Sequence, residues 1–180
     1  IPVELVPAVY EQACRLGVGV LTYKGNTIIH GNGVNEYSSI EAKINGMPME
    51  EVDNFAEYVD YPVNKFLMTG EPEKIAKAQD VMRQTFGEQL NIFRSEPFFL
   101  EIVPPSIDKA YSLGKLLEYL GEKKEQMICC GDGFNDKSMI AFAGLGVAMA
   151  NAQPEVKEVA DYITTSNDED GVALVIDRFM

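Results

Sequence analysis

The chain has 180 residues, of which 46% are hydrophobic, and its formal net charge is −13. This length and composition fit one or two globular domains and argue against a disordered chain. The acidic balance argues against a nucleic-acid partner, because affinity for a polyanion rests on lysines and arginines that neutralise phosphates. A small phosphorylated ligand is not excluded, since it needs only local positive charge.

The first half of the chain mixes helices with hairpin-like strands. The predicted elements are a helix at 4–16, strands at 18–21, 27–30 and 63–68, a helix at 72–86 and a strand at 90–95. The two early strands flank a Gly25-Asn26 turn, which predicts a β-hairpin. We assign no element between residues 31 and 62. The only histidine, His30, is expected in a surface turn, because no second histidine exists to build a site. The pattern favours an α+β module with an antiparallel sheet.

The second half alternates short apolar runs with helical segments. The predicted elements are strands at 97–103, 127–130, 145–149 and 162–165, and helices at 108–120, 136–143, 154–160 and 171–179. Strands and helices that alternate at this spacing predict a parallel sheet with helices on its faces. The Pro104-Pro105 pair ends the first of these strands, and we expect the domain boundary in the stretch from Pro97 to Pro105. The predicted domains are residues 1–97 and 98–180.

Three cysteines, Cys14, Cys129 and Cys130, bear on the cellular compartment. Their odd number and lack of a spaced framework indicate reduced thiols and a cytoplasmic protein. Neither a basic leader nor an apolar run of membrane-spanning length is visible in the sequence. We therefore expect no association with a membrane.

The most informative motif is Gly-Asp-Gly-Phe-Asn-Asp at residues 131–136, directly after the predicted strand at 127–130. Its glycines allow a sharp turn, and open α/β sheets bind ligands beyond the carboxyl ends of their strands. Two carboxylates at such a place suit Mg²⁺, which is commonly bound together with substrate phosphates. The alternative interpretation of the motif is a plain glycine turn with an aspartate that caps the next helix.

The longer run GDGFNDKSMI, followed by AGLGVAMANA, resembles the last conserved motif of the haloacid dehalogenase (HAD) superfamily of phosphohydrolases. It is most similar to the Cof-type sugar-phosphate phosphatases. The resemblance implies an α/β fold, in which residues 1–97 form an α+β cap domain. Residues 98–180 would form the C-terminal half of the Rossmann-like core, with its parallel sheet.

The resemblance also implies roles for four residues. Asp132 matches the direct Mg²⁺ ligand, and Asp136 matches the second acid, which holds the ion through water or orients its ligands. Asn135 matches a residue near the phosphate, and Lys109 matches the lysine that neutralises the phosphoryl group. Independently, Lys109 stands at the start of a predicted helix, where the helix dipole disfavours a cation unless an anion lies nearby. The alternative roles are helix capping for Asn135 and Asp136, and a solvated side chain for Lys109.

One family feature is absent from this sequence. The family's nucleophile is the first aspartate of an Asp-x-Asp pair at the end of the first core strand. The only Asp-x-Asp here is at residues 168–170, in a segment that resembles the family's closing loop, for which we expect a mainly structural role. The resemblance therefore implies that the chain is a C-terminal fragment and is inactive alone.

In the intact protein, the resemblance implies hydrolysis of a small phosphorylated metabolite, such as a sugar phosphate, through an aspartyl-phosphate. Because the core would be incomplete, we expect weak Mg²⁺ binding at most. We also expect either self-association through the exposed sheet edge or a chain that was trimmed after the intact protein had folded. Two alternatives stay open: the phosphorylation domain of a P-type ATPase, and a non-catalytic module that binds a phosphorylated ligand. Nothing in residues 1–97 identifies the substrate.

Overall fold

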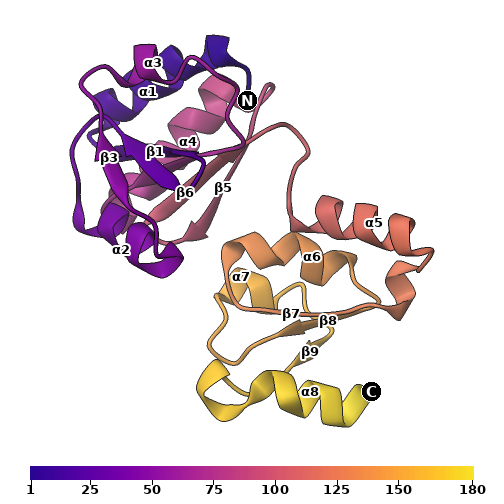
Figure 1. Cartoon of the computed structure of the whole chain (residues 1–180). Coiled ribbons are helices and arrows are strands. Elements are labelled where there is room, and N and C mark those ends of the chain that lie inside the picture. The colour runs from indigo at the N-terminus through magenta and orange to yellow at the C-terminus, as the bar shows by residue number, and fades with distance from the viewer. The chain divides into compact units, whose positions relative to one another are not determined.

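The computed structural model describes the whole chain, Ile1–Met180, and contains two compact units (Figure 1). The first unit spans Ile1–Ser106 and the second spans Ile107–Met180. No helix combines the length and the apolar character that crossing a membrane would require. An α+β unit is thus followed by a unit with a parallel sheet, which confirms the predicted α/β class.

The first unit is built on a six-stranded sheet with the strand order β3-β2-β1-β4-β6-β5. Strands β2 and β3 are parallel, and all other neighbouring strands are antiparallel. The strands are β1 (Gly19–Lys24), β2 (Thr27–His30), β3 (Met49–Glu51), β4 (Phe66–Thr69), β5 (Asn91–Glu96) and β6 (Phe99–Val103). The helices are η1 (Val3–Leu5), α1 (Val6–Leu16), α2 (Glu36–Asn45), α3 (Phe55–Tyr58) and α4 (Pro72–Phe86).

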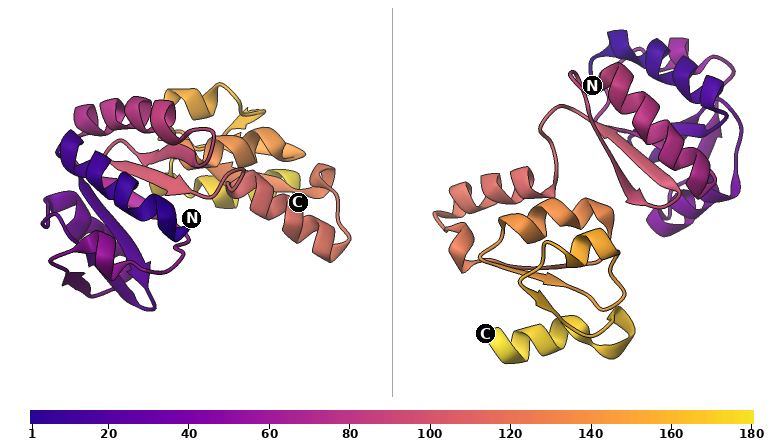
Figure 2. Two further views of the ribbon diagram at one scale, coloured as in Figure 1. Left: turned by 90° about the horizontal axis from the view of Figure 1, so that it is seen from above. Right: turned by 180° about the vertical axis from the view of Figure 1, so that it is seen from behind.

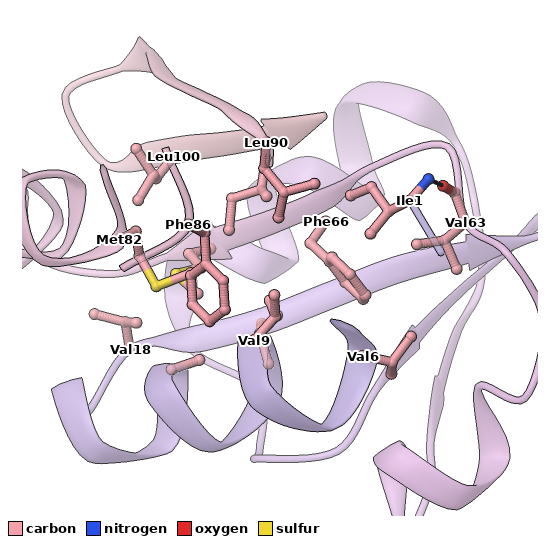
Figure 3. Packing of buried hydrophobic residues seen from close by; sticks show 14 of the residues in the cluster. Ile1, Val6, Val9, Val18, Val63, Phe66, Met82, Phe86, Leu90 and Leu100 are labelled. Atoms are coloured by element: carbon pink, nitrogen blue, oxygen red, sulfur yellow. Dashed lines mark hydrogen bonds between the residues drawn. The ribbon is translucent and has the colours of Figure 1, made fainter. Parts of the chain in front are cut away.

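Helices cover both faces of this sheet. Successive side chains of a strand point to opposite faces, so one strand contributes to a cluster on each face. On β4, Phe66 and Met68 join the main core cluster, to which α1, α3 and α4 also contribute. Figure 3 shows Val9 of α1 and Met82 of α4 within this cluster. Leu67 points the other way, into a smaller cluster against which residues of α2 pack.

The boundary between the two units differs from the prediction. The predicted strand at 97–103 was expected to begin the second domain. Its residues instead form β6, which pairs with β4 and β5 in the first sheet. The division therefore follows Ser106 rather than residue 97. The reason is that an apolar run predicts a buried strand but does not indicate which sheet the strand joins.

The second unit contains a three-stranded parallel sheet with the order β7-β8-β9. Its strands are β7 (Ile128–Gly131), β8 (Leu145–Ala148) and β9 (Tyr162–Ile163). Its helices are α5 (Lys109–Leu120), η2 (Lys124–Gln126), η3 (Phe134–Asp136), α6 (Lys137–Phe142), α7 (Pro154–Lys157), η4 (Asn167–Glu169) and α8 (Gly171–Phe179). Helices α6 and α7 lie on one face and α8 on the other, while α5 packs beside α6 (Figures 1 and 2).

Two further expectations for the first unit were incomplete or wrong. Helices α2 and α3 and strand β3 occupy the stretch 31–62, to which the sequence assigned no element. His30 is not in a surface turn: it is only 3% exposed and is the last residue of β2. The polar, glycine-rich sequence around His30 concealed the burial that its pairing with Leu21 and Glu51 imposes.

Candidate functional site

Four segments of the second unit meet at the carboxyl edge of its sheet. Strand β7 ends at Gly131 and leads directly into Asp132, and β8 ends at Ala148, three residues before Asn151. The segment after β9 reaches the same edge, because the backbone N–H of Ala150 donates to the carbonyl of Thr165 over 3.2 Å. The fourth segment is the first turn of α5, which contributes Lys109.

Asp136 is the most buried of the predicted site residues, with 6% of its surface exposed. It ends η3 and precedes α6, and its carboxylate turns back over the end of β7. Gly131 makes this approach possible: a Cβ at Gly131 would lie 2.7 Å from the Oδ2 atom of Asp136. Any larger residue at position 131 would push the Asp136 carboxylate away from the strand.

Hydrogen-bond donors of the chain engage both oxygens of Asp136. Oδ2 accepts from the backbone N–H of Asp132 at 2.9 Å and from that of Gly133 at 3.1 Å. Oδ1 accepts a short hydrogen bond from the Nζ atom of Lys109, whose side chain is 46% exposed. Such charge-assisted bonds are among the stronger hydrogen bonds in proteins. They fix the turn and hold the lysine at the edge of the sheet.

Asp132 differs from Asp136 because it is exposed and keeps one oxygen free. Its Oδ2 accepts from the Nδ2 of Asn151 at 2.7 Å, and its carbonyl accepts from the backbone N–H of Gln153 at 3.0 Å. Its Oδ1 has no partner within the chain. The structure therefore presents one unpaired carboxylate oxygen to solvent at this edge of the sheet.

The structure brings Lys109 and Asp136 into contact across 27 positions of sequence, and it places Asp132 beside them. Asn135 lies within η3 between the two aspartates; it is partly buried and forms no hydrogen bond through its side chain. Asn151 was missed as a neighbour of this group. The sequence could have indicated this contact, because Asn151 follows β8 as Asp132 follows β7, and both strands end at the same edge of the sheet.

The closing loop expected at residues 167–171 is exposed except at its last residue, Gly171, which is buried. Asp170 has a left-handed backbone with φ 53°, and a Cβ at Gly171 would lie 2.3 Å from the carbonyl oxygen of Thr165. The Thr164 hydroxyl donates to the Gly171 carbonyl over 2.8 Å. The only Asp-x-Asp of the sequence lies in this exposed loop, at residues 168–170.

Two thiols lie on the strand that leads into the site. Burial raises the pKa of Cys129, and the neighbouring Cys130 and the Asp136 carboxylate raise it further. Burial also raises the pKa of Cys130. Because the nucleophilic form of cysteine is the thiolate, both residues are unsuited to nucleophilic chemistry at neutral pH.

The site offers few oxygen ligands to a metal ion. No group of three or more His, Cys, Asp or Glu side chains is placed to hold a metal. The Oδ1 of Asp132 fits Mg²⁺ as one ligand of several, because Mg²⁺ keeps most of its waters and is usually bound through one or two carboxylates. Asp136 fits a supporting role, since donors already occupy both of its oxygens.

Comparisons with known proteins support one family. A family model described as haloacid dehalogenase-like hydrolase matches residues 1–176. A protein named putative phosphatase from Haemophilus influenzae is 36% identical over 128 residues, which are 71% of this chain and 48% of that protein. The chain spans about half the length of such curated relatives.

Two solved structures are also similar to the chain. A haloacid dehalogenase-like hydrolase from Bacteroides thetaiotaomicron is 46% identical, with a TM-score of 0.83, over 100% of this chain and 68% of that one. A sugar phosphatase of HAD subclass IIB is 25% identical, with a TM-score of 0.82, over 99% of this chain and 67% of that one. The sequence motif, the family model and the fold therefore agree.

Proposed function

Since the chain belongs to the haloacid dehalogenase-like hydrolases, in their Cof-type branch, we propose that it is part of a Mg²⁺-dependent phosphomonoester hydrolase. The observation that carries this proposal is the contact between Lys109 and Asp136 beside the free Oδ1 of Asp132. A cation and an unpaired carboxylate oxygen lie together at the edge where α/β sheets bind ligands. A phosphoryl group with its metal ion needs both kinds of charge.

The hydrogen bonds of the four site residues suggest a different role for each. Asp132 would hold Mg²⁺ through Oδ1, and Asp136 would fix the turn and aim the Lys109 ammonium at the phosphoryl oxygens. Asn135, whose carboxamide has no partner in the chain, would donate to a phosphate oxygen. When bound, Mg²⁺ would neutralise the charge that spreads over the transferring phosphoryl group.

We propose that the attacking carboxylate lies outside these 180 residues. In this scheme an aspartate oxygen bonds to phosphorus as the alcohol leaves, and water then hydrolyses the aspartyl-phosphate. The two units would correspond to the cap and to the C-terminal half of the core. Support comes from the single Asp-x-Asp, which lies in the loop at residues 168–170 rather than at a strand end.

The substrate class that we propose is a small phosphorylated metabolite. The sugar phosphatase among the similar structures supports a sugar phosphate or a related monoester. The three cysteines are all free thiols, which is typical of proteins in reducing compartments and supports the cytoplasm as the location.

The test is a hydrolase assay of the full-length gene product that carries this chain, on a panel of phosphomonoesters with and without Mg²⁺. We expect Mg²⁺-dependent turnover that falls by about 100-fold or more in Lys109→Met and in Asp132→Asn, by analogy with the loss of other charge-stabilising groups. The control is Lys115→Met on the same helix, because Lys115 pairs only with exposed Glu118. Turnover that survives Lys109→Met would contradict the proposal, and ligand binding without turnover would favour a non-catalytic module.

A further inference from the structure

Asn151 links the two loops that flank its own strand end. Its Nδ2 donates to Oδ2 of Asp132 over 2.7 Å, and its Oδ1 accepts from the backbone N–H of Asn167 over 3.1 Å. The orientation of the carboxamide follows from its partners, because a carboxylate can only accept and a backbone N–H can only donate. The nitrogen of Asn151 therefore faces Asp132.

The backbone around Asn151 is held on both sides. The N–H of Met149 donates to the carbonyl of Gly131 at 3.0 Å, and the N–H of Ala150 donates to that of Thr165 at 3.2 Å. The Lys157 ammonium donates to the carbonyl of Ala150 at 2.6 Å. Met149 is 5% exposed, so its side chain anchors the segment in the unit. Asn151 thus reaches Asp132 from a fixed support.

The bond to Asn151 decides which oxygens Asp132 offers. With Oδ2 occupied by an N–H donor, only Oδ1 is available to a cation. A carboxylate that is limited to one oxygen suits Mg²⁺, which requires near-ideal octahedral geometry. Ca²⁺ is larger and accepts carboxylates through both oxygens, so it loses a binding mode that Mg²⁺ does not need.

We propose that Asn151 is a positioning residue that makes Asp132 a one-oxygen ligand and thereby favours Mg²⁺ over Ca²⁺. The inference deepens the proposed function, on which it rests. Asn151 need not touch the ion or the substrate; it acts through the Asp132 carboxylate. Its tie to Asn167 is a separate, structural contact of the same side chain.

Two variants separate these two contacts. Asn151→Ala removes both hydrogen bonds. Asn167→Pro removes only the N–H that bonds to Oδ1 of Asn151, and it does so at the first residue of η4, a helix position where proline is tolerated. The exposed Asn64 of the first unit provides the matched control, Asn64→Ala.

The measurement is a pair of NMR titrations of the 180-residue chain with MgCl₂ and with CaCl₂ at millimolar concentrations, following the amides of residues 131–136. We expect the Ca²⁺ dissociation constant divided by the Mg²⁺ dissociation constant to fall by about tenfold in Asn151→Ala. Loss of an outer-shell partner typically changes the affinity for a metal by about 10-fold to 100-fold, and here the change should be larger for Mg²⁺. The ratio should stay at the wild-type value in Asn167→Pro and Asn64→Ala. Amide exchange of residue 167 without metal should accelerate in Asn151→Ala.

Three results would overturn the inference. They are an unchanged ratio in Asn151→Ala, an equal shift in Asn167→Pro, and a wild-type chain whose residues 131–136 respond to neither ion. An unchanged ratio with Mg²⁺ bound at Asp132 would leave the proposed function standing. The hydrolase assay of the full-length protein decides that function independently.

Discussion

The two units of this chain differ in how much apolar surface they bury and in where they carry polar chemistry. The main cluster of the first unit contains twenty-one buried residues, whereas the cluster of the second contains four. The Lys109–Asp136 ion pair, the free Oδ1 of Asp132 and the strand-end Asn151 all lie in the second unit. The first unit thus has the larger apolar core, and the second unit carries the polar network of the candidate site at the edge of its sheet.

Exposed apolar side chains show the same contrast. Tyr119 on α5 is 87% exposed, and Leu174 and Ile176 on α8 are 47% and 50% exposed. In the first unit only Val34, Ile40 and Ile44 are comparable large exposed residues. We therefore expect the first unit to be the more stable one, and the second to depend more on its hydrogen bonds.

The largest effect should come from a cavity in the first unit. Phe66 is fully buried between the sheet and its helices (Figure 3), so Phe66→Ala should lower the free energy of unfolding of this unit by about 3–5 kcal/mol. Phe179, which is 40% exposed in the second unit, is the matched control. Urea unfolding followed by residue-resolved NMR measures each unit. Equal losses of unfolding free energy in the two variants would contradict the claim that the first unit is the better packed.

The second effect tests the dependence of the second unit on its polar network. Asp136→Asn should destabilise this unit by about 2 kcal/mol, because two backbone donors and Lys109 lose a charged acceptor. Asp177→Asn on α8 is the control, since Asp177 is exposed and surface substitutions usually change stability by about 0.5 kcal/mol or less. The same urea experiment measures both. A loss in Asp136→Asn no larger than the control would show that the network does not hold the unit together.

The exposed apolar faces should make the second unit associate. Contiguous apolar patches on a surface mark interaction sites, and the exposed Val172, Ile176 and Phe179 are spaced so that they share one side of α8. Light scattering should show a mass that rises with concentration, and Ile176→Lys should reduce the rise. The control is Ile44→Lys, at an exposed position on α2. A monomeric wild-type chain at high concentration would refute the expectation of self-association.

The smallest effect concerns alkaline pH, where the units should weaken in different ranges. Burial raises the pKa of Cys129 and Cys130 above the ordinary value of 9.0. The thiols therefore contribute fully to the free energy of unfolding below pH 9.0, and this contribution declines as the pH rises above that value. In the first unit, burial and Glu71 raise the pKa of Tyr37 to about 12 from 10.0, so its contribution declines between those values. Urea midpoints measured from pH 8 to 12 should fall first for the second unit. The reverse order would contradict the assignment.

Local signals in the sequence predicted much of the fold. Gly121 ends α5 in a left-handed conformation with φ 74°, as expected of a glycine stop, and the Asp108 side chain caps the start of that helix. The alternation of strands and helices after residue 126 predicted the parallel sheet, which the structure confirms. Helix α2 was missed because its buried residues, Ser38 and Glu41, are polar and leave no apolar stripe.

The features that could not be predicted depend on long-range pairing. Strand β6 pairs with β5, which directly precedes it, and also with the distant β4. The short connection from β5 was a local signal for the first sheet, whereas no local pattern encodes the pairing with β4. The bond from Asn151 to Asp132 likewise joins two different strand ends. The sequence did indicate that Lys109 needs a nearby anion, and the structure places the Asp136 carboxylate in contact with it. The catalytic and metal-binding roles of these residues stay predictions.

The central claim is that the cation site of this acidic chain lies at the carboxyl edge of the β7–β9 sheet, on Asp132. Paramagnetic broadening by dilute Mn²⁺, used as a substitute for Mg²⁺, tests it most directly in the 180-residue chain. We predict that the amide signals of residues 131–136 and of Asn151 broaden first, while the amide signals of the first unit stay sharp. The substitution Asp132→Asn should abolish this broadening. Broadening that begins among the acidic residues of the first unit, or that persists in Asp132→Asn, would contradict the account.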